Sequence, residues 1–294
     1  MAHTEIVVIG GGPAGLQAAL SLGRIHRTVV VLDDGHYRNS TVRHMHNVLG
    51  ADGTSPERFR ARAREQLDAY ETVALRREQA SEIVQGDGGF AVRLTGGEVV
   101  DARAVILATG VRDELPAVAG LQDLWGGRAA QCPFCHAHEF AGGRFAILGL
   151  APAAHLAPLL APVAGSVTVL PLATDETEAP AGLTVAGSAV VGMRDTGSAV
   201  EVTLADGGLE TVDVVFAVPA LRQRAPFAAR LGLELTSSGC VRVDEFQRTS
   251  LPGLFAAGDM AHQSAYPMPM ASVIAAAASG QLAASAATMH LLLS

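Results

Sequence analysis

The sequence contains no lysine, so all 21 of its Lys and Arg residues are arginines. Catalysis through a lysine Schiff base is therefore excluded. The formal net charge is −8. Because binding to nucleic acid or to an anionic membrane surface requires clustered cations, we expect neither as a partner.

Long apolar runs and cysteines are also scarce. No apolar stretch approaches the length of a membrane span, and the first residues, Met1 to Glu5, lack the basic region of a secretory signal. Three cysteines, Cys132, Cys135 and Cys240, are too few for a disulfide framework. The sequence predicts a cytoplasmic protein, and its 294 residues are enough for two domains.

A β-α-β unit opens the chain. Residues 6–9 predict a buried strand, an apolar-periodic helix follows and ends near Leu22, and residues 28–32 predict the next strand. A G-x-G-x-x-G motif lies between the first strand and the helix. Its glycines permit a tight turn and close approach of the backbone to a pyrophosphate, and the helix N-terminus supplies N–H donors.

This motif predicts a dinucleotide site. Asp33, at the end of the second strand, is expected to hydrogen-bond a ribose hydroxyl. The loop residues expected to contact the dinucleotide are Gly10, Gly12, Pro13, Ala14 and Gly15.

A second β-α-β pattern follows at residues 145–170. The predicted fold is α/β, with two Rossmann-like domains, the second inserted into the first. We expect one domain from residues 1–113 and 243–294, and an inserted domain from 114–242. The helix expected after Pro56 carries arginines and glutamates throughout, and we interpret it as having a solvated face.

Cys132-Pro133-Phe134-Cys135-His136 places two thiols at the spacing of a reversible redox disulfide. His136 or His138 could act as the base, because histidine titrates near neutrality. The same order of residues occurs in c-type haem attachment, which requires export, and the cysteines with both histidines could bind zinc. No signal peptide and no second ligand pair are evident, so we favour the redox reading and expect no metal.

Two later stretches, at 107–110 and 254–259, resemble the second and third FAD signatures of the two-dinucleotide flavoproteins. With the dithiol in the inserted domain, the whole chain resembles low-molecular-weight thioredoxin reductase. The resemblance implies FAD as the cofactor, with Asp259 holding its ribityl-phosphate portion. The resemblance also implies that FAD is contacted by Asn47, Thr109, Gly110, Gly258 and Asp259.

The same resemblance assigns roles to the thiols. It implies that Cys135 faces the flavin as the charge-transfer thiol and that Cys132 exchanges with substrate. A helix expected from about Ala271, followed by Ser272, would direct its positive N-terminus at the flavin.

The inserted domain departs from the reductase pattern. In its Gly-rich loop, Ala151 replaces a glycine and Pro152 removes an N–H donor. No arginine for a 2′-phosphate occurs between Arg144 and Arg194, whereas Asp175, Glu176 and Glu178 would repel one. His136 stands where reductases of this type usually carry an aspartate.

These departures shift the resemblance to the FAD-dependent dithiol oxidases of gliotoxin and holomycin biosynthesis, which share the Cys-x-x-Cys-His order. The stretch from Arg38 to Gly50, with His44 and His46, is also similar to theirs. The resemblance implies that a small-molecule dithiol reduces the enzyme disulfide, that FAD receives the electrons, and that oxygen takes them to give hydrogen peroxide. It also implies a homodimer.

Two other functions stay open. One is a thioredoxin-type disulfide reductase that uses NADPH or another reductant, and the other is a non-catalytic flavoprotein redox sensor. We interpret Cys240 as a core residue. We interpret the apolar loop at Met268 and Met270 as a cover for the core, with a pocket for an apolar substrate as the alternative.

Overall fold

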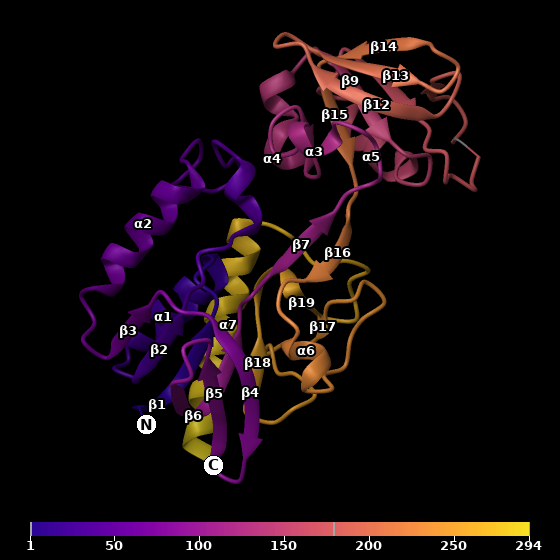
Figure 1. The fold of residues 1–294 in the computed structure, drawn as a ribbon. Helices are drawn as coiled ribbons and strands as arrows, with labels where there is room; N and C mark the ends of the chain where they lie inside the picture. Colours follow the sequence, from indigo (N-terminus) through magenta and orange to yellow (C-terminus); the bar gives the residue numbers. More distant parts are fainter. Residues whose placement is uncertain (1, 179, 294) are drawn as a thin grey trace. The chain divides into compact units, whose positions relative to one another are not determined.

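The computed structural model describes residues 2–178 and 180–293. The chain forms two compact units (Figure 1). The first comprises the chain up to Ser40, Glu57–Arg112 and the chain from Leu221 onward, and the second comprises Thr41–Pro56 and Asp113–Ala220. The predicted α/β fold, with one unit inserted into the other, is confirmed.

The joints between the units differ from those predicted. The chain enters the second unit at Asp113, next to the expected joint, but returns at Leu221, well before residue 243. The return is early because β16 (Ala220–Gln223) pairs with β7 (Val111–Glu114), and the following residues pack into the core of the first unit. The segment Thr41–Pro56, expected in the first domain, groups with the second unit.

The first unit is built on a parallel sheet of order β3-β2-β1-β6, with β18 also paired to β6. A hairpin, β4–β5, joins the sheet in antiparallel fashion along β6. The strands are β1 (Ala2–Ile9), β2 (Val29–Leu32), β3 (Val73–Arg76), β4 (Ala80–Gly86), β5 (Gly89–Leu94), β6 (Val99–Leu107) and β18 (Leu254–Ala256), with a separate parallel pair, β17 (Val241–Arg242) and β19 (Ala261–His262). The helices are α1 (Pro13–Gly23), α2 (Pro56–Leu67), α6 (Phe227–Arg230) and α7 (Val273–Leu293).

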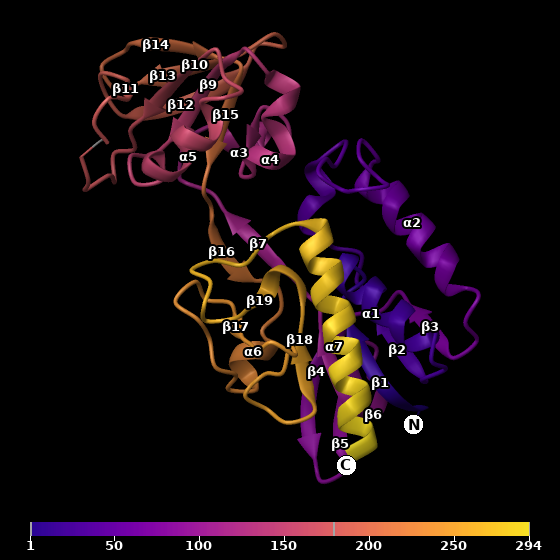
Figure 2. The same ribbon diagram turned by 180° about the vertical axis from the view of Figure 1, so that it is seen from behind.

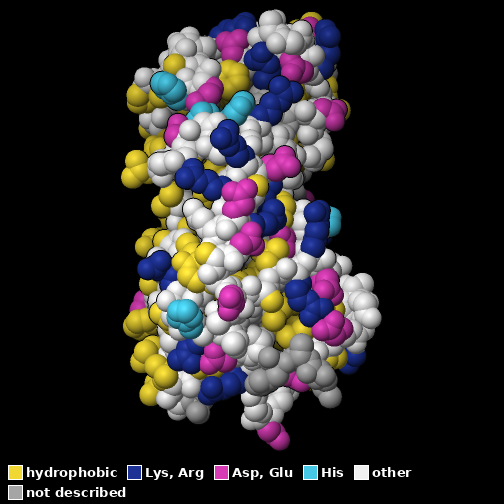
Figure 3. Space-filling view, turned by 90° about the vertical axis from the view of Figure 1, so that its left-hand side faces the viewer, with side chains coloured by type: hydrophobic (Ala, Val, Ile, Leu, Met, Phe, Trp, Pro, Cys, Tyr) yellow, Lys and Arg dark blue, Asp and Glu magenta, His cyan; other side chains and the backbone are white. Residues whose placement is uncertain are grey.

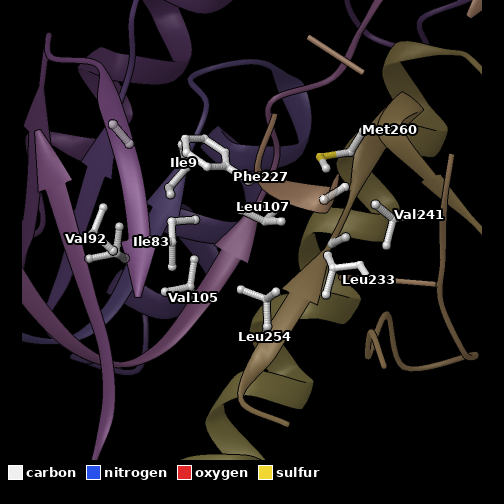
Figure 4. Packing of buried hydrophobic residues seen from close by; sticks show 14 of the residues in the cluster. Ile9, Ile83, Val92, Val105, Leu107, Phe227, Leu233, Val241, Leu254 and Met260 are labelled. Carbon is white, nitrogen blue, oxygen red and sulfur yellow. The ribbon is translucent and has the colours of Figure 1, made fainter. Parts of the chain in front are cut away.

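Alternate residues of β1 serve two cores, because successive strand side chains point to opposite faces of a sheet. Ile6 and Val8 pack with α1 and α7. Val7 and Ile9 pack on the other face with the β4–β5 hairpin and with residues after the return, such as Phe227 (Figure 4). The core that contains Val7 and Ile9 therefore holds residues 221–243 in the first unit.

Helix α7 lies against α1, as the yellow helix of Figure 2 shows. Gly280 makes this approach possible, since a Cβ there would stand 2.0 Å from the carbonyl oxygen of Ala14. The end of the chain thereby covers the helix that follows the glycine-rich loop.

The second unit contains a parallel sheet of order β11-β10-β9-β15-β8 and an antiparallel sheet of order β12-β13-β14. Its helix α5 follows β9, as the predicted β-α-β pattern requires, and contains Pro158. The elements are α3 (Leu121–Leu124), β8 (Ala129–Ala130), α4 (Pro133–His136), β9 (Arg144–Leu148), α5 (Ala153–Leu160), β10 (Ser166–Leu170), β11 (Thr184–Val185), β12 (Val190–Asp195), β13 (Val200–Leu204), β14 (Leu209–Val212) and β15 (Val214–Ala217).

The exposure of individual side chains confirms one prediction and contradicts another. Cys240 is fully buried in the first unit, as predicted. Met268 and Met270 are 39% and 70% exposed, so they do not cover the core. On the face shown in Figure 3, arginines and acidic side chains are interspersed. Across residues 2–178 and 180–293, no helix combines the length and apolarity needed to cross a membrane. The cytoplasmic location stays a prediction.

Candidate functional site

The glycine-rich loop joins β1 to α1. Gly10 has a φ of 118°, where only glycine is unstrained, and a Cβ on Gly15 would lie 1.9 Å from the carbonyl oxygen of Gly10. Gly12 is the N-cap of α1 and precedes Pro13 at the first helical position. A Cβ on Gly12 would meet no described atom within 4 Å. The N-cap, Gly12, makes no side-chain cap hydrogen bond to the first amides of α1.

The later stretches that the sequence predicted for FAD meet this loop. The carbonyl oxygen of Ala108 would stand 2.2 Å from a Cβ on Gly10, and a Cβ on Gly258 would stand 3.1 Å from that of Ala14. The structure therefore gathers in one place the predicted residues Gly10, Gly12, Pro13, Ala14, Gly15, Thr109, Gly110, Gly258 and Asp259.

Asp259 forms an ion pair with Arg38, at 2.8 Å between Oδ2 and the guanidinium. Both side chains are largely buried, with 20% and 17% exposed. The pairing joins the late motif to the segment after β2. The sequence singled out Arg38 by resemblance but did not predict its partner.

Asp33 lies at the carboxyl end of β2 and is 3% exposed. Its Oδ2 accepts hydrogen bonds from the Tyr37 hydroxyl at 2.6 Å and from Arg64 at 2.7 Å, and its Oδ1 accepts from the Gly35 amide at 3.0 Å. Burial raises the pKa of Asp33, but these three hydrogen bonds outweigh it and the pKa is lowered. Burial and the neighbouring carboxylate raise the pKa of Tyr37 to about 12.

Helix α2 corrects the interpretation of a solvated face. Arg60 is 6% exposed, and Arg64 pairs with Asp33. Pro56, Arg60, Arg64 and Leu67 recur at helical spacing on the side of α2 that is turned inward. This spacing is the signal that could have revealed the buried arginines, and the charges on the other faces of α2 conceal it.

The first unit fits FAD. Amides at the N-terminus of α1 suit a diphosphate. A carboxylate offers about four acceptor positions, so Asp33 retains one for a ribose hydroxyl. Gly11 allows this placement, since a Cβ there would lie 2.2 Å from the Asp33 Cγ. The residues that would hold the cofactor all belong to one unit, apart from Asn47.

Asn47 lies in the loop Thr41–Pro56, which belongs to the second unit. The Asp52 carboxylate organises this loop by accepting the Asn47 amide at 2.7 Å and lying 3.3 Å from Nδ1 of His46. The other ring nitrogen of His46 lies 3.4 Å from Glu139, near the dithiol. The flavin contact assigned to Asn47 stays a prediction.

Ala271 and Ser272 precede α7 instead of starting it. The Ser272 hydroxyl accepts the amide of Ala275 at 3.0 Å and so caps the helix N-terminus. Their predicted contact with the flavin stays a prediction.

Cys132 and Cys135 form a disulfide at the start of α4, with their Cα atoms 5.3 Å apart. Cys132 is the N-cap, and the Cys135 amide donates to its carbonyl at 3.1 Å. Phe134, between the two, is 70% exposed. The pair sits on a short local turn, where a disulfide can open and close with little movement of the rest of the unit.

His136 ends α4, directly after Cys135. Its Nδ1 is buried and has no hydrogen-bond partner in the part of the chain that the structure describes. Burial lowers the pKa of His136 below its ordinary 6.5, against the raising effect of Gly126 and Glu139. The imidazole is therefore neutral near pH 7 and able to take a proton. His138 is exposed.

A metal site is not evident at the dithiol. Within the described ranges, no three His, Cys, Asp or Glu side chains converge in a way that could hold a metal ion.

The Gly-rich loop of the second unit is hydrogen-bonded to a carboxylate of the same unit. Oδ2 of Asp175 accepts the amides of Leu150 at 3.0 Å and Leu172 at 2.7 Å. Pro152 has no N–H, and the Ala153 amide donates back to the Leu150 carbonyl. The Asp175 carboxylate thus uses the Leu150 amide, which is one of the donors that this loop could offer to a nucleotide pyrophosphate.

An FAD cradle in one unit and a redox disulfide in the other define a flavin-dependent disulfide oxidoreductase. The sequence profile of the pyridine nucleotide-disulphide oxidoreductase family matches residues 4–150 and 173–280, and the chain belongs to this family. FAD is its cofactor, as predicted.

The relatives agree with the thioredoxin reductase resemblance. The chain is 37% identical over 278 residues to thioredoxin reductase aclD of Aspergillus oryzae, covering 87% of this chain and 88% of that protein. It is 33% identical over 308 residues to thioredoxin reductase sirT of Leptosphaeria maculans, covering 96% and 92%. The crystal structure of HlmI is similar with a TM-score of 0.88 and 31% identity, covering 99% and 93%.

Proposed function

We propose that this protein is an FAD-dependent dithiol oxidase that closes a disulfide in a small-molecule dithiol, with oxygen as the acceptor. The observation that carries the proposal is the Asp175 carboxylate, which follows β10 and accepts the Leu150 amide of the second Gly-rich loop. The Asp175 carboxylate and the pyrophosphate of a nucleotide would both be negatively charged at this loop and would repel each other. A pyridine nucleotide is therefore a poor source of electrons. Reducing equivalents then enter through the thiols.

The thiol chemistry balances on the two cysteines. A substrate thiolate attacks Sγ of Cys132, which breaks the Cys132–Cys135 bond and releases the Cys135 thiolate. The second substrate thiol attacks the substrate sulfur of the mixed disulfide, forms the product disulfide and releases Cys132. The enzyme dithiol has then gained two electrons. Bound FAD supplies the carrier between this dithiol and oxygen, which is reduced to hydrogen peroxide.

The proton acceptor in this scheme is His136. Its uncommitted Nδ1 and lowered pKa suit a base that removes a thiol proton and returns it. His138, the other candidate from the sequence, is exposed and offers no such environment.

The direction of electron flow is tested by anaerobic mixing. A small dithiol should bleach the visible flavin band within the turnover time, and NADPH should leave it oxidised. Admitting air should restore the band and release hydrogen peroxide in proportion to the dithiol oxidised. Rapid bleaching by NADPH would contradict the proposal.

A disulfide reductase is the second candidate, and the names of aclD and sirT as thioredoxin reductases favour it. It would draw electrons from NADPH or from another reduced partner. The same mixing experiment separates the oxidase from an NADPH-dependent reductase, because only that reductase predicts bleaching by NADPH without a dithiol. For a reductase with another reduced partner the distinction is the hydrogen peroxide released in air, which only the oxidase predicts in proportion to the dithiol oxidised.

A homodimer is proposed as well. Exposed apolar side chains lie on one face of α7, namely Ile274, Leu282, Met289 and Leu292. Replacing Leu282 and Met289 together by Glu should halve the mass in solution to 30.2 kDa, because charges on an apolar interface oppose association. Light scattering after gel filtration measures this, with Ile25→Glu, exposed elsewhere, as the control. An unchanged mass would contradict this interface.

A further inference from the structure

The His46 ring lies between two carboxylates of the second unit. Its Nδ1 is 3.3 Å from Oδ2 of Asp52, in the same loop, and its Nε2 is 3.4 Å from Oε1 of Glu139, in the turn His138–Phe140. A neutral imidazole has one N–H donor and one acceptor, so it can donate to only one of the two carboxylates, whereas the imidazolium donates to both. The contacts of His46 are therefore those of a protonated ring. Contact with His46 is also the main cause that lowers the pKa of Asp52.

The loop Thr41–Pro56 meets the surroundings of His136 at two places. Glu139, the partner of His46, follows His136 by three residues in a helical stretch, a spacing that puts both side chains on one face. At the start of the loop, Thr41 packs against Gly126, where a Cβ would stand 2.5 Å from the threonine hydroxyl oxygen. The backbone of Gly126 in turn hydrogen-bonds the His136 ring. The loop is thus in contact with both neighbours of the candidate base.

The two histidines have opposite surroundings. Burial disfavours a charged imidazole and carboxylates favour one, so neighbouring rings in these surroundings can hold opposite charge states, a neutral base and a cation. Burial is the main cause of the lowered pKa of His136, with His46 lowering it further and Glu139 raising it. In the part of the chain that the structure describes, the titratable groups recorded against His46 are Asp52, Glu139 and His136.

We propose that His46 is a positioning residue of the dithiol site, which as a cation holds the loop Thr41–Pro56 to residues 132–140 and places a positive charge beside His136. A nearby positive charge opposes protonation of His136 and so keeps this ring ready to take a thiol proton. The inference rests on the proposed role of His136 as the base and holds for either direction of electron flow.

A merely structural role of His46 is the competing explanation. The Asp52 carboxylate also accepts the Asn47 amide at 2.7 Å, so the loop has an internal order that the imidazole could simply complete. In that case any replacement that disturbs the packing of the ring would disturb the site, whatever its charge. A role through charge predicts instead that a cationic replacement keeps the effect and a neutral one loses it.

The test follows the protonation of His136 in the oxidised holoenzyme by NMR of its ring Cε1–H group, which is identified by its loss in His136→Asn and needs no turnover. His46→Gln should raise the pH midpoint of His136 by about half a pH unit or more, because a nearby positive charge is removed. His46→Arg keeps a cation that can bridge two carboxylates, so the midpoint should stay within about 0.2 pH unit of the wild type. His44→Gln, exposed in the same loop, is the matched control and should leave the midpoint unchanged.

The acidic limb of kcat/KM for dithiol oxidation should move to higher pH in His46→Gln by the same amount as the NMR midpoint. An unchanged midpoint in His46→Gln, or an equal rise in His46→Gln and His46→Arg, would overturn the proposal. A raised midpoint without a matching change in the acidic limb would support the charge on His46 and contradict only the role of His136 as the base. His46→Asn serves as the neutral replacement if the Gln variant does not fold.

Discussion

Replacing Cys135 by Ser should reduce dithiol oxidation by about 10⁴-fold or more while leaving the protein yellow with bound FAD. The serine cannot form a disulfide with Cys132, so the enzyme has no disulfide that the substrate dithiol can reduce. The FAD cradle lies in the first unit and Cys135 in the second, so the substitution changes none of the cradle residues. Oxygen consumption and the visible flavin spectrum measure the two effects.

Cys240→Ser is the matched control for this variant. Cys240 is the third cysteine, fully buried, and its sulfur hydrogen-bonds the carbonyl of Asp259 at 3.5 Å, which a serine hydroxyl can also do. Turnover should therefore persist in that variant. Normal steady-state turnover by Cys135→Ser would remove the dithiol from the reaction and with it the proposed scheme.

The parts of the fold that follow from local sequence were predictable. Strand β1, the Gly-rich turn and Asp33 all lie within the first 33 residues, so their pattern suffices to predict the β-α-β unit. The β-α-β pattern that contains α5 was predicted for the same reason. In each of these cases the neighbours along the chain are also the neighbours in space.

The joint at Leu221 could not be predicted in this way. Residues 221–243 contain too little regular periodicity to reveal which unit they pack against, and their partners are β1 and the β4–β5 hairpin, far away in sequence. The burial of Arg60 has the same cause, since it depends on Tyr37 and Asn39 outside α2. Tertiary contacts decided both outcomes.

The role of Asp175 could be predicted from the sequence only in part. Its charge predicted repulsion of a phosphate from sequence alone. Its actual position, bonded to the amides of Leu150 and Leu172, depends on the turn after β10. The structure adds to the repulsion of charges a specific contact, since the carboxylate already uses the Leu150 amide of the loop.

Replacing His136 by Asn should lower the rate of dithiol oxidation by about 10²- to 10⁴-fold, the range for loss of a general base. It should also change the pH dependence. Because burial lowers the pKa of His136 below 6.5, the neutral base persists under mildly acidic conditions, and wild-type activity should fall only as the pH drops through that lowered value. The variant should lack this acidic limb in a plot of kcat/KM against pH.

His138→Asn is the control for this prediction, since His138 lies two residues away and is exposed. It should keep both the rate, to within about twofold, and the acidic limb. The residues around His136 act in opposite directions, with Glu139 raising its pKa and His46 lowering it, so removing the carboxylate by Glu139→Gln should move the limb to lower pH. An unchanged limb in His136→Asn, together with its loss in His138→Asn, would transfer the role of base to His138.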